Sequence, residues 1–278
     1  MKLRNNPYQV FRFSKTPAGL YARQKWLGES EEPQWKLDFQ ETVSDLWADQ
    51  SPDGSWHHET VTTIKHLFGL HLTVRSSNAQ IEAALTWLLK KINLQTEEIR
   101  FSAEDVGTGA DLTGLPFVPS RPDMFLTGAT LFLASIFGRE SDPDVLAIYQ
   151  WLSAEGLKNK GQWFDEASSH NIMRAMVVHP VYARDPAAAK YVAYLADFQS
   201  ESGDWGNDFP LYQTMNALAH LNLPGADIQL ERAFNRLVEN QNEDGSWSRS
   251  EPEWNTFLAI HALRNKGLVQ ERLQSRWQ

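Results

Sequence analysis

Apolar residues recur at three- and four-residue steps over much of the chain, and short polar stretches interrupt them. Residues 62–72 and 83–89 show this step clearly, and the period places their apolar side chains on one face of an α-helix. The polar links at 76–78 and 224–227 combine residues that end one helix with residues that cap the next. The pattern therefore predicts pairs of helices joined by short links, with almost no strand.

Longer interruptions repeat one turn, which we call the Gly-Trp turn. Its copies run from Gln50 to Trp56, from Gln199 to Trp205 and from Gln241 to Trp247, with a weaker copy from Leu157 to Trp163 and a degenerate one from Gln95 to Phe101. The last three tryptophans are spaced by 42 residues, and a fixed period of this size indicates stacked supersecondary units. Glycine permits a positive φ, and the Gln amide can bond backbone groups at helix ends. A structural role is therefore favoured over catalysis for these residues.

Helix pairs between the turns predict one all-α domain over residues 1–278. Its six hairpins are expected at 16–49, 59–93, 123–157, 167–198, 208–241 and 251–277. Such hairpins can stack as an open superhelix or close into a ring.

One interval between turns is too long for the repeat, and the excess predicts an insertion at 102–123. A long loop in a regular array needs a reason. We expect this loop to cover a cavity, to deliver Asp105 and Asp111 into that cavity, or to replace a lost turn. The following stretch, 124–137, is apolar on every face, which favours a deeply buried helix over a contact with an apolar ligand or a membrane.

The Gly-Trp turn, with glutamine six residues before the tryptophan, resembles the QW repeat of squalene-hopene and oxidosqualene cyclases. More broadly, the chain resembles the toroid superfamily of terpenoid cyclases and protein prenyltransferases. This resemblance implies an (α/α)6 toroid, whose central cavity holds an isoprenoid chain in many relatives. The partner it implies is an apolar small molecule.

The catalytic motifs of that superfamily are missing from the sequence. The acid motif Asp-x-Asp-Asp and the magnesium motif Asp-Asp-x-x-Asp do not occur, and a chain without cysteine cannot form the Asp, Cys and His zinc site of protein prenyltransferases. No cofactor is therefore predicted, and no motif supports a magnesium site.

Composition narrows the functional classes. The net charge of −9 argues against a nucleic-acid partner. No apolar run is long enough to span a bilayer, and residues 1–8 lack the apolar block of a secretory signal. We expect a cytoplasmic protein, with peripheral membrane contact left open and no expectation about oligomeric state.

Acidic residues recur three positions after the tryptophans of the turns, at Glu59, Glu166 and Asp208. If the following helices line a cavity, these carboxylates would gather at one mouth of it, where they would raise one another's pKa and supply a proton or bind a cation. The alternative, which we favour, is that an acid in the first helical turn stabilises the helix dipole. With Asp105 and Asp111 from the insertion, these residues are the candidate proton donors.

The same registration, seven residues after each tryptophan, gives a second set of candidates. It contains His170, Tyr212 and Trp254, followed three residues later by Met173, Met215 and Phe257. Aromatic and thioether side chains suit an apolar ligand or a carbocation, and His170 is a candidate acid or base. Packed core is the favoured alternative.

Three further histidines, His71, His220 and His261, occupy similar positions near helix ends. We favour a role at the helix dipole over metal binding, because a ring would separate equivalent positions.

Three functions remain open from the sequence. The first is a terpenoid-cyclase-like enzyme that binds a prenyl or polyprenyl chain and cyclises it by acid initiation. The second is a carbohydrate-active enzyme on the same ring, with paired carboxylates in a polar groove. The third is a scaffold or lipid-binding protein without catalysis.

Overall fold

The structure is a computed structural model that describes residues 1–93, 100–101 and 111–269. It is helical apart from one two-residue ladder, so the predicted all-α fold class is confirmed. The chain divides into two compact units, which we describe separately. The single domain expected from the sequence stays a prediction.

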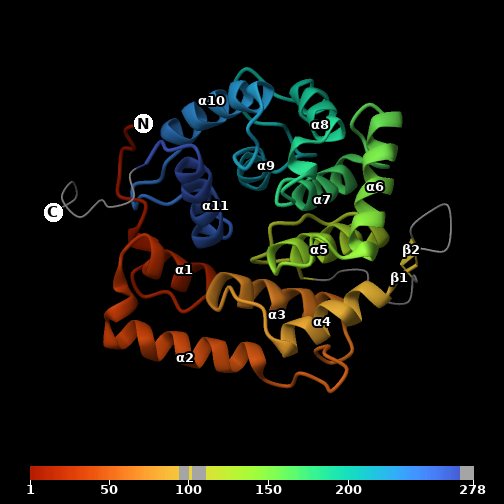
Figure 1. The fold of residues 1–278 in the computed structure, drawn as a ribbon. Helices are drawn as coiled ribbons and strands as arrows, with labels where there is room; N and C mark the ends of the chain where they lie inside the picture. The colour runs from red at the N-terminus through yellow and green to blue at the C-terminus, as the bar shows by residue number, and fades with distance from the viewer. Residues whose placement is uncertain (94–99, 102–110, 270–278) are drawn as a thin grey trace. The chain divides into compact units, whose positions relative to one another are not determined.

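Unit 1 combines the two ends of the chain, residues 1–46 and 198–278. Its α-helices are α1 (Pro17–Lys25), α2 (Pro33–Trp47), α9 (Leu211–Leu218), α10 (Pro224–Glu239) and α11 (Pro252–Asn265), and it has short 3-10 helices η1 (Gln9–Phe11) and η2 (Glu29–Glu31). Helix α11 packs against both α1 and α9 (Figure 1). Residues from opposite ends of the sequence thus share one core.

Unit 2 is the continuous segment 47–197. Its elements are α3 (Thr60–Thr73), α4 (Ala79–Lys90), β1 (Ile92–Asn93), β2 (Arg100–Phe101), α5 (Pro122–Ile136), α6 (Pro143–Lys158), α7 (Glu166–Met176), η4 (Tyr182–Arg184) and α8 (Pro186–Ala196). Strands β1 and β2 are antiparallel. The degenerate turn expected at 95–101 lies mostly outside the described residues, and so do residues 102–110 of the 102–123 insertion.

The helix boundaries follow the local signals in the sequence. The Asn78 side chain caps α4 by accepting hydrogen bonds from the N–H groups of Gln80 and Ile81, and Pro224 starts α10. Both links therefore separate two helices, as expected. In the sixth hairpin, α11 ends at Asn265, and residues 270–277 lie outside the described part of the chain.

The apolar helix α5 is buried along most of its length. All eleven residues from Met124 to Ala134 are buried, which confirms the favoured interpretation of its composition. Helix α5 packs against both α3 and α7 (Figure 1). Gly128 makes the α7 contact close, because a Cβ there would lie 2.6 Å from the backbone oxygen of Asn171.

Two glycines of the Gly-Trp turns, Gly54 and Gly203, lie directly on a neighbouring helix. Gly54 has a φ of +95°, and a Cβ on it would lie 2.4 Å from the backbone carbon of Ala83 in α4. Gly203 has a φ of +89° and would lie 2.5 Å from the backbone oxygen of Arg232 in α10. Both the backbone conformation and the close approach therefore require glycine.

The glutamines of the turns tie the same elements together. The Nε2 atom of Gln50 donates to the carbonyl oxygens of Gly54 and Gln80, at 2.9 and 3.1 Å. Gln199 donates to Gly203 and Gln229 in the same way. Each amide thus bonds its own turn and the second helix of the next hairpin, which is the structural role expected from the sequence.

The tryptophans of the turns are core residues. Trp56, Trp163, Trp205 and Trp247 are all buried. Three of their indole N–H groups donate to backbone carbonyls that lie upstream in the chain, at Ala48, Leu152 and Leu237, and that of Trp205 donates to the Gln229 side chain. The weaker turn at Trp163 therefore holds its tryptophan by the same kind of bond as the copies at Trp56 and Trp247.

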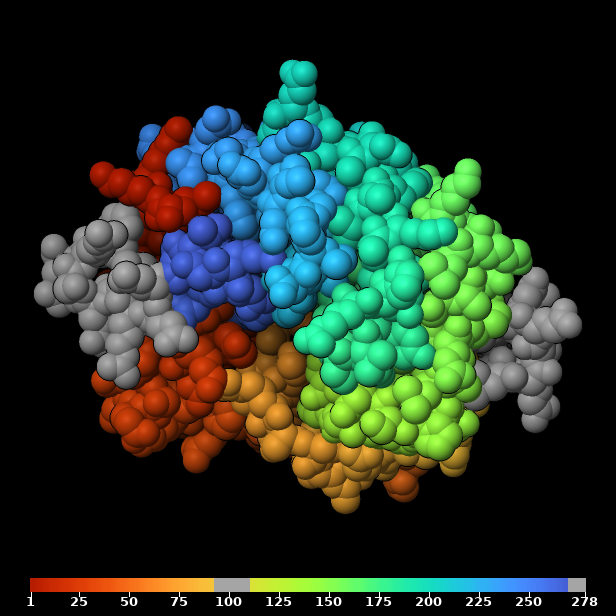
Figure 2. Space-filling view, turned by 45° about the horizontal axis from the view of Figure 1, so that its top comes forward, coloured from red at the N-terminus to blue at the C-terminus, as the bar shows by residue number. Residues whose placement is uncertain are grey.

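The turn from Gln241 to Trp247 bonds the N-terminal segment instead of a helix. Gln241 Oε1 accepts from the N–H groups of Arg4 and Asn5, and its Nε2 donates to the Asn5 carbonyl. A Cβ on Gly245 would lie 2.1 Å from the Asn6 oxygen. The red N-terminal residues lie against the blue C-terminal part of unit 1 in Figures 1 and 2. At this turn, residues 4–6 thus make the contacts that the second helix of the next hairpin makes at the turns of Gln50 and Gln199.

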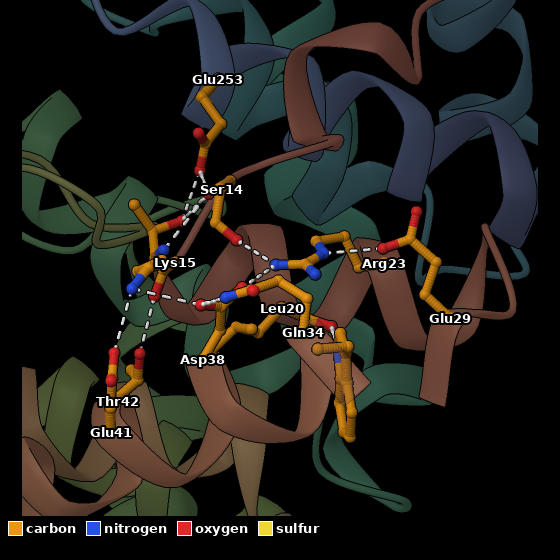
Figure 3. Close-up of polar contacts among 12 residues, drawn as sticks. Ser14, Lys15, Leu20, Arg23, Glu29, Gln34, Asp38, Glu41, Thr42 and Glu253 are labelled. Atoms are coloured by element: carbon orange, nitrogen blue, oxygen red, sulfur yellow. Dashed lines mark hydrogen bonds and ion pairs between the residues drawn. The ribbon is translucent and has the colours of Figure 1, made fainter. Parts of the chain in front are cut away.

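A buried ion pair holds α1 against α2. Arg23 donates through Nη1 to Asp38 Oδ2 at 2.7 Å and through Nε to Glu29 Oε2 at 2.8 Å (Figure 3). The side chains of Arg23 and Asp38 are 4% and 3% exposed. Gln34 and Lys15 bond the second oxygen of Asp38. This carboxylate is therefore bonded from three sides, as a buried charge requires.

Candidate functional site

Aromatic side chains of unit 2 gather around Phe132 of α5. Its ring centroid lies 6.0 Å from that of Phe68 and 6.1 Å from that of His71, both on α3. The Phe117 ring, from the loop before α5, lies 5.6 Å away, edge-on. We call these four side chains the Phe132 cluster. The three phenylalanines are buried, so the cluster is an apolar environment with polarisable ring faces.

Arg174 of α7 brings a positive charge to this cluster. Its guanidinium carbon lies 5.6 Å from the Phe132 ring centroid, and the residue is 3% exposed. Burial lowers the pKa of the Arg174 guanidinium to about 9, because the charged form loses its hydration. The side chain still carries its charge at neutral pH.

His170 lies one helical turn before Arg174 and is also buried. It hydrogen-bonds to the backbone of Pro116, and proline offers only a carbonyl there, so the imidazole is the donor. Nε2 is buried and makes no hydrogen bond, which makes Nδ1–H the donor and leaves the Nε2 lone pair as an acceptor. Burial, and then the charge of Arg174, lower the pKa of His170 to about 3. The ring is therefore neutral at pH 7.

The loop that supplies Phe117 is fixed to α7. The Asn171 side chain accepts from the Val118 N–H at 2.9 Å and donates to the Val118 carbonyl at 2.8 Å. Its amide also donates to the Ser120 hydroxyl. These bonds, with that of His170 to Pro116, hold the described end of the insertion on the helix that carries Arg174.

Unit 1 has a second aromatic group, the Phe257 stack. The Phe257 ring of α11 stacks on Trp254 at 5.4 Å and on Trp26 at 5.1 Å, with interplanar angles of 9° and 27°. Tyr21 of α1 packs edge-on at 5.5 Å. The structure thus brings the predicted pair Trp254 and Phe257 together. Tyr21 of α1 and Trp26, the residue after that helix, complete the stack, and the repeat pattern marks neither of them.

His220 and His261 also meet in unit 1. Their ring centroids lie 5.4 Å apart, and the Asn216 amide lies 3.2 Å from Nδ1 of His261. The expectation that equivalent positions are kept apart is wrong for this pair, because α9 and α11 pack directly on each other. Within the described ranges, no three His, Asp or Glu side chains form a group that would hold a metal ion.

Two of the candidate carboxylates at the turns, Glu59 and Glu166, have separate partners. Glu59 precedes α3, is exposed, and accepts from the Thr62 hydroxyl. Glu166 starts α7, is half-buried, and accepts from the Tyr194 hydroxyl at 3.2 Å. Asp208 is exposed in the turn before α9.

Of the two acids in the insertion, Asp105 lies outside the described residues. Asp111 is exposed and forms an ion pair with Lys65 at 2.6 Å. This hydrogen bond from Lys65, with those from Thr113, holds the pKa of the Asp111 carboxyl well below its ordinary value. Asp111 is therefore ionised at neutral pH.

Counting from the tryptophans does not give equivalent helical positions. The N–H groups of Trp56, Trp163 and Trp247 donate to the hydroxyls of Thr63, Ser169 and Thr256, which lie seven, six and nine residues further on. The following helices start at different distances from the turn, so a fixed count drifts along them. If the helices are aligned on these hydroxyls, Thr256 takes the position of Ser169, and Phe257 therefore takes the position of His170.

The remaining predicted side chains lie in the helices as follows. Met173 and Met215 are fully buried in α7 and α9. Tyr212 of α9 is half-buried, and burial raises the pKa of its hydroxyl. The sequence reasoning missed Arg174, Phe132 and Trp26. Arg174 lies four residues after His170, and that spacing was the available signal for a shared helix face.

No helix of the described ranges has the length and apolarity to cross a bilayer. No family model matches the sequence, and no curated protein matches it.

The fold is similar to solved structures over nearly the whole chain. A protein from Actinoplanes matches with a TM-score of 0.59 at 17% identity, over 92% of this chain and 90% of that chain. The type II terpene cyclase MstE from Scytonema matches with a TM-score of 0.58 at 12% identity, over 95% of this chain and 90% of that one. A variant of MstE in complex with its substrate, geranylgeranyl dihydroxybenzoate, matches with a TM-score of 0.56. The chain therefore has the helical fold of a type II terpene cyclase.

Proposed function

We propose that this protein binds a prenyl or polyprenyl chain and cyclises it by acid initiation. The observation that supports this function is the Phe132 cluster of unit 2, on a terpene-cyclase-like fold. Aromatic rings offer apolar surface to a prenyl chain, and their faces stabilise positive charge. The structurally similar MstE binds a geranylgeranylated aromatic acid, which makes a substrate of that size a suitable probe.

The reaction requires one proton donor and one proton acceptor. A proton adds to a terminal alkene, a carbon–carbon bond closes the ring on the resulting cation, and a proton leaves at the end, so the product is an isomer of the substrate. The proposed donors are Asp105, Glu59 and Glu166. Among those the structure describes, Glu166 is the less exposed and bonds a tyrosine hydroxyl. Asp111, held ionised by Lys65, is less suited.

His170 is the proposed acceptor. Its Nε2 lone pair is buried and makes no hydrogen bond, and its neutral state suits a base. A pKa of about 3 makes it a weak base, yet a carbocation loses its proton readily. The same pKa argues against His170 as the initial donor.

The test is to incubate the protein with geranylgeranyl dihydroxybenzoate and with farnesyl and geranylgeranyl compounds, with and without magnesium, and to analyse extracts by mass spectrometry. We expect a cyclised isomer that Glu166→Gln or Asp105→Asn reduces at least about 100-fold. Glu231→Gln, at an exposed position of α10, is the matched control.

Two results would contradict the cyclase. A bound prenyl compound recovered unchanged would indicate a lipid-binding protein on this fold. No binding at all would remove the isoprenoid function and return the choice to a carbohydrate enzyme or a scaffold.

A further inference from the structure

One loop of unit 1 holds an aromatic side chain in water. Phe13, between η1 and α1, is 88% exposed, more than any other large apolar side chain of the described residues. The exposed residues beside it along the chain, Arg12, Lys15 and Thr16, are polar. We call residues 12–16 the Phe13 loop. Single exposed apolar residues are common in proteins, so the loop is informative only together with its charge and its attachment.

Positive charge is concentrated in the segment that contains this loop. Residues 1–28 include six Lys and Arg residues and no Asp or Glu, although the whole chain has a net charge of −9. Residues 29–278 therefore carry a net charge of −15. The most exposed aromatic ring thus belongs to the one basic stretch of an acidic protein.

Arg12 supplies the unbalanced charge of the Phe13 loop. Its side chain is exposed and forms no ion pair within the described part of the chain. Lys15, in contrast, pairs with Asp38 and Glu41 of α2 (Figure 3), and Asp38 is itself buried. An apolar ring next to an unpaired cation suits a surface that is apolar below and anionic above.

The Phe13 loop is firmly attached on the side away from the solvent. The Ser14 carbonyl accepts from Nη1 of the buried Arg23 at 3.0 Å, and the Ser14 hydroxyl donates to Glu253 of α11 at 2.8 Å (Figure 3). The residue after Phe13 is therefore bonded to two helices of unit 1. A ring that is held in place before it binds loses little entropy on binding.

We propose that the Phe13 loop docks on an anionic lipid bilayer, with the Phe13 ring at the acyl boundary and Arg12 at the headgroup phosphates. A protein interface of standard size buries about 800 Å² on each partner around an apolar core, whereas polar residues flank Phe13 on both sides. A bilayer surface accepts a single ring, and anionic lipids attract basic side chains. The association is reversible, because one ring and a few charges bind weakly. It does not depend on the cyclisation.

Vesicle flotation tests this contact. Wild-type protein is mixed with vesicles of phosphatidylcholine alone or with about 30% phosphatidylglycerol, at low salt and in about 0.5 M NaCl. We expect binding to the anionic vesicles and a large loss of that binding in the salt. Phe13→Ser should lower the partition coefficient at least about 10-fold because the ring is lost, and Arg12→Gln should lower it about 5-fold.

Unit 2 provides the matched controls. Val181 is 67% exposed and Arg184 is exposed, so Val181→Ser and Arg184→Gln should leave the partition coefficient unchanged. The chain has no cysteine, and Phe13→Cys and Val181→Cys therefore each accept one environment-sensitive fluorophore. On anionic vesicles, the emission of the label at position 13 should shift to shorter wavelength, and that of the label at position 181 should not.

Three results would overturn the membrane contact. The first is that the wild type fails to bind anionic vesicles at low salt. The second is that Phe13→Ser lowers binding no more than Val181→Ser does. The third is binding to polyglutamate in place of vesicles, which would indicate an acidic protein partner. Each result leaves the proposed cyclisation as it stands, because that reaction is assayed without vesicles.

Discussion

At the scale of single residues, His170 makes stability depend on pH. Its pKa is about 3 in the folded protein and 6.5 for an ordinary histidine. Below about pH 6.5 the unfolded chain therefore takes up a proton that the folded protein does not, and folding loses free energy as the pH falls. We expect the melting temperature to drop between pH 6.5 and 4.5, with a shallower slope in His170→Gln. Equal slopes in wild type and His170→Gln would contradict this, and exposed His57→Gln is the control.

The glycines of the turns allow a second comparison between single residues. Gly54→Ala introduces a Cβ 2.4 Å from the α4 backbone at a φ of +95°, whereas a Cβ at Gly28, with a φ of +74°, has no neighbour within 4 Å. Gly28→Ala should therefore cost about 1 kcal/mol of unfolding free energy for the backbone conformation alone. Gly54→Ala should cost at least about 2 kcal/mol more, because α4 must move. Urea unfolding of both variants measures the difference, and similar costs would show that α4 is not rigid at this contact.

At the scale of elements, the buried ion pair fixes how α1 meets α2. Asp38→Ala leaves Arg23 buried without its 2.7 Å partner, and we expect a loss of about 3–5 kcal/mol in unfolding free energy. The double variant Arg23→Met, Asp38→Leu removes both charges and should recover a large part of that loss. Chemical denaturation of the single and double variants tests this. A double variant as unstable as the single one would assign the effect to packing instead of charge.

The elements also show how far the sequence predicts this fold. The turns were predictable, because the positive φ of Gly54 and Gly203 and the buried indoles impose local residue choices at a fixed spacing. The register of the helix that follows each turn was not predictable. The hydroxyl that accepts from the tryptophan N–H lies six, seven or nine residues further on, depending on the turn. Arg174 was missed because only its tertiary packing against Phe132 distinguishes it from an arginine on the surface, and the sequence does not show that packing.

At the scale of the whole molecule, the two units are built differently from the order of the chain. Unit 2 is one continuous segment, whereas unit 1 needs residues 1–46 and 198–278 together. The repeat pattern predicts every hairpin as an equal neighbour of the next and gives no sign of this difference. The N-terminal segment joins unit 1 through α1, which packs against α11, and through the turn at 241–247, where Gln241 bonds Arg4 and Asn5. Folding of unit 1 therefore closes a loop of most of the chain, which carries a large entropy cost.

Deletion of residues 1–7 should consequently weaken unit 1 at the turn that runs from Gln241 to Trp247. Gln241, at 8% exposure, would lose both N–H donors and the Asn5 carbonyl, and each buried polar group left without a partner costs about 1–3 kcal/mol. Hydrogen exchange should become faster at residues 241–247 than in the full chain. The equivalent turn at 50–56 in unit 2, bonded to Gln80, should keep its protection. Deletion of residues 1–2 alone, which spares the bonds to Gln241, is the matched control; equal acceleration at both turns would mean that the N-terminal segment supports the whole chain and not this turn.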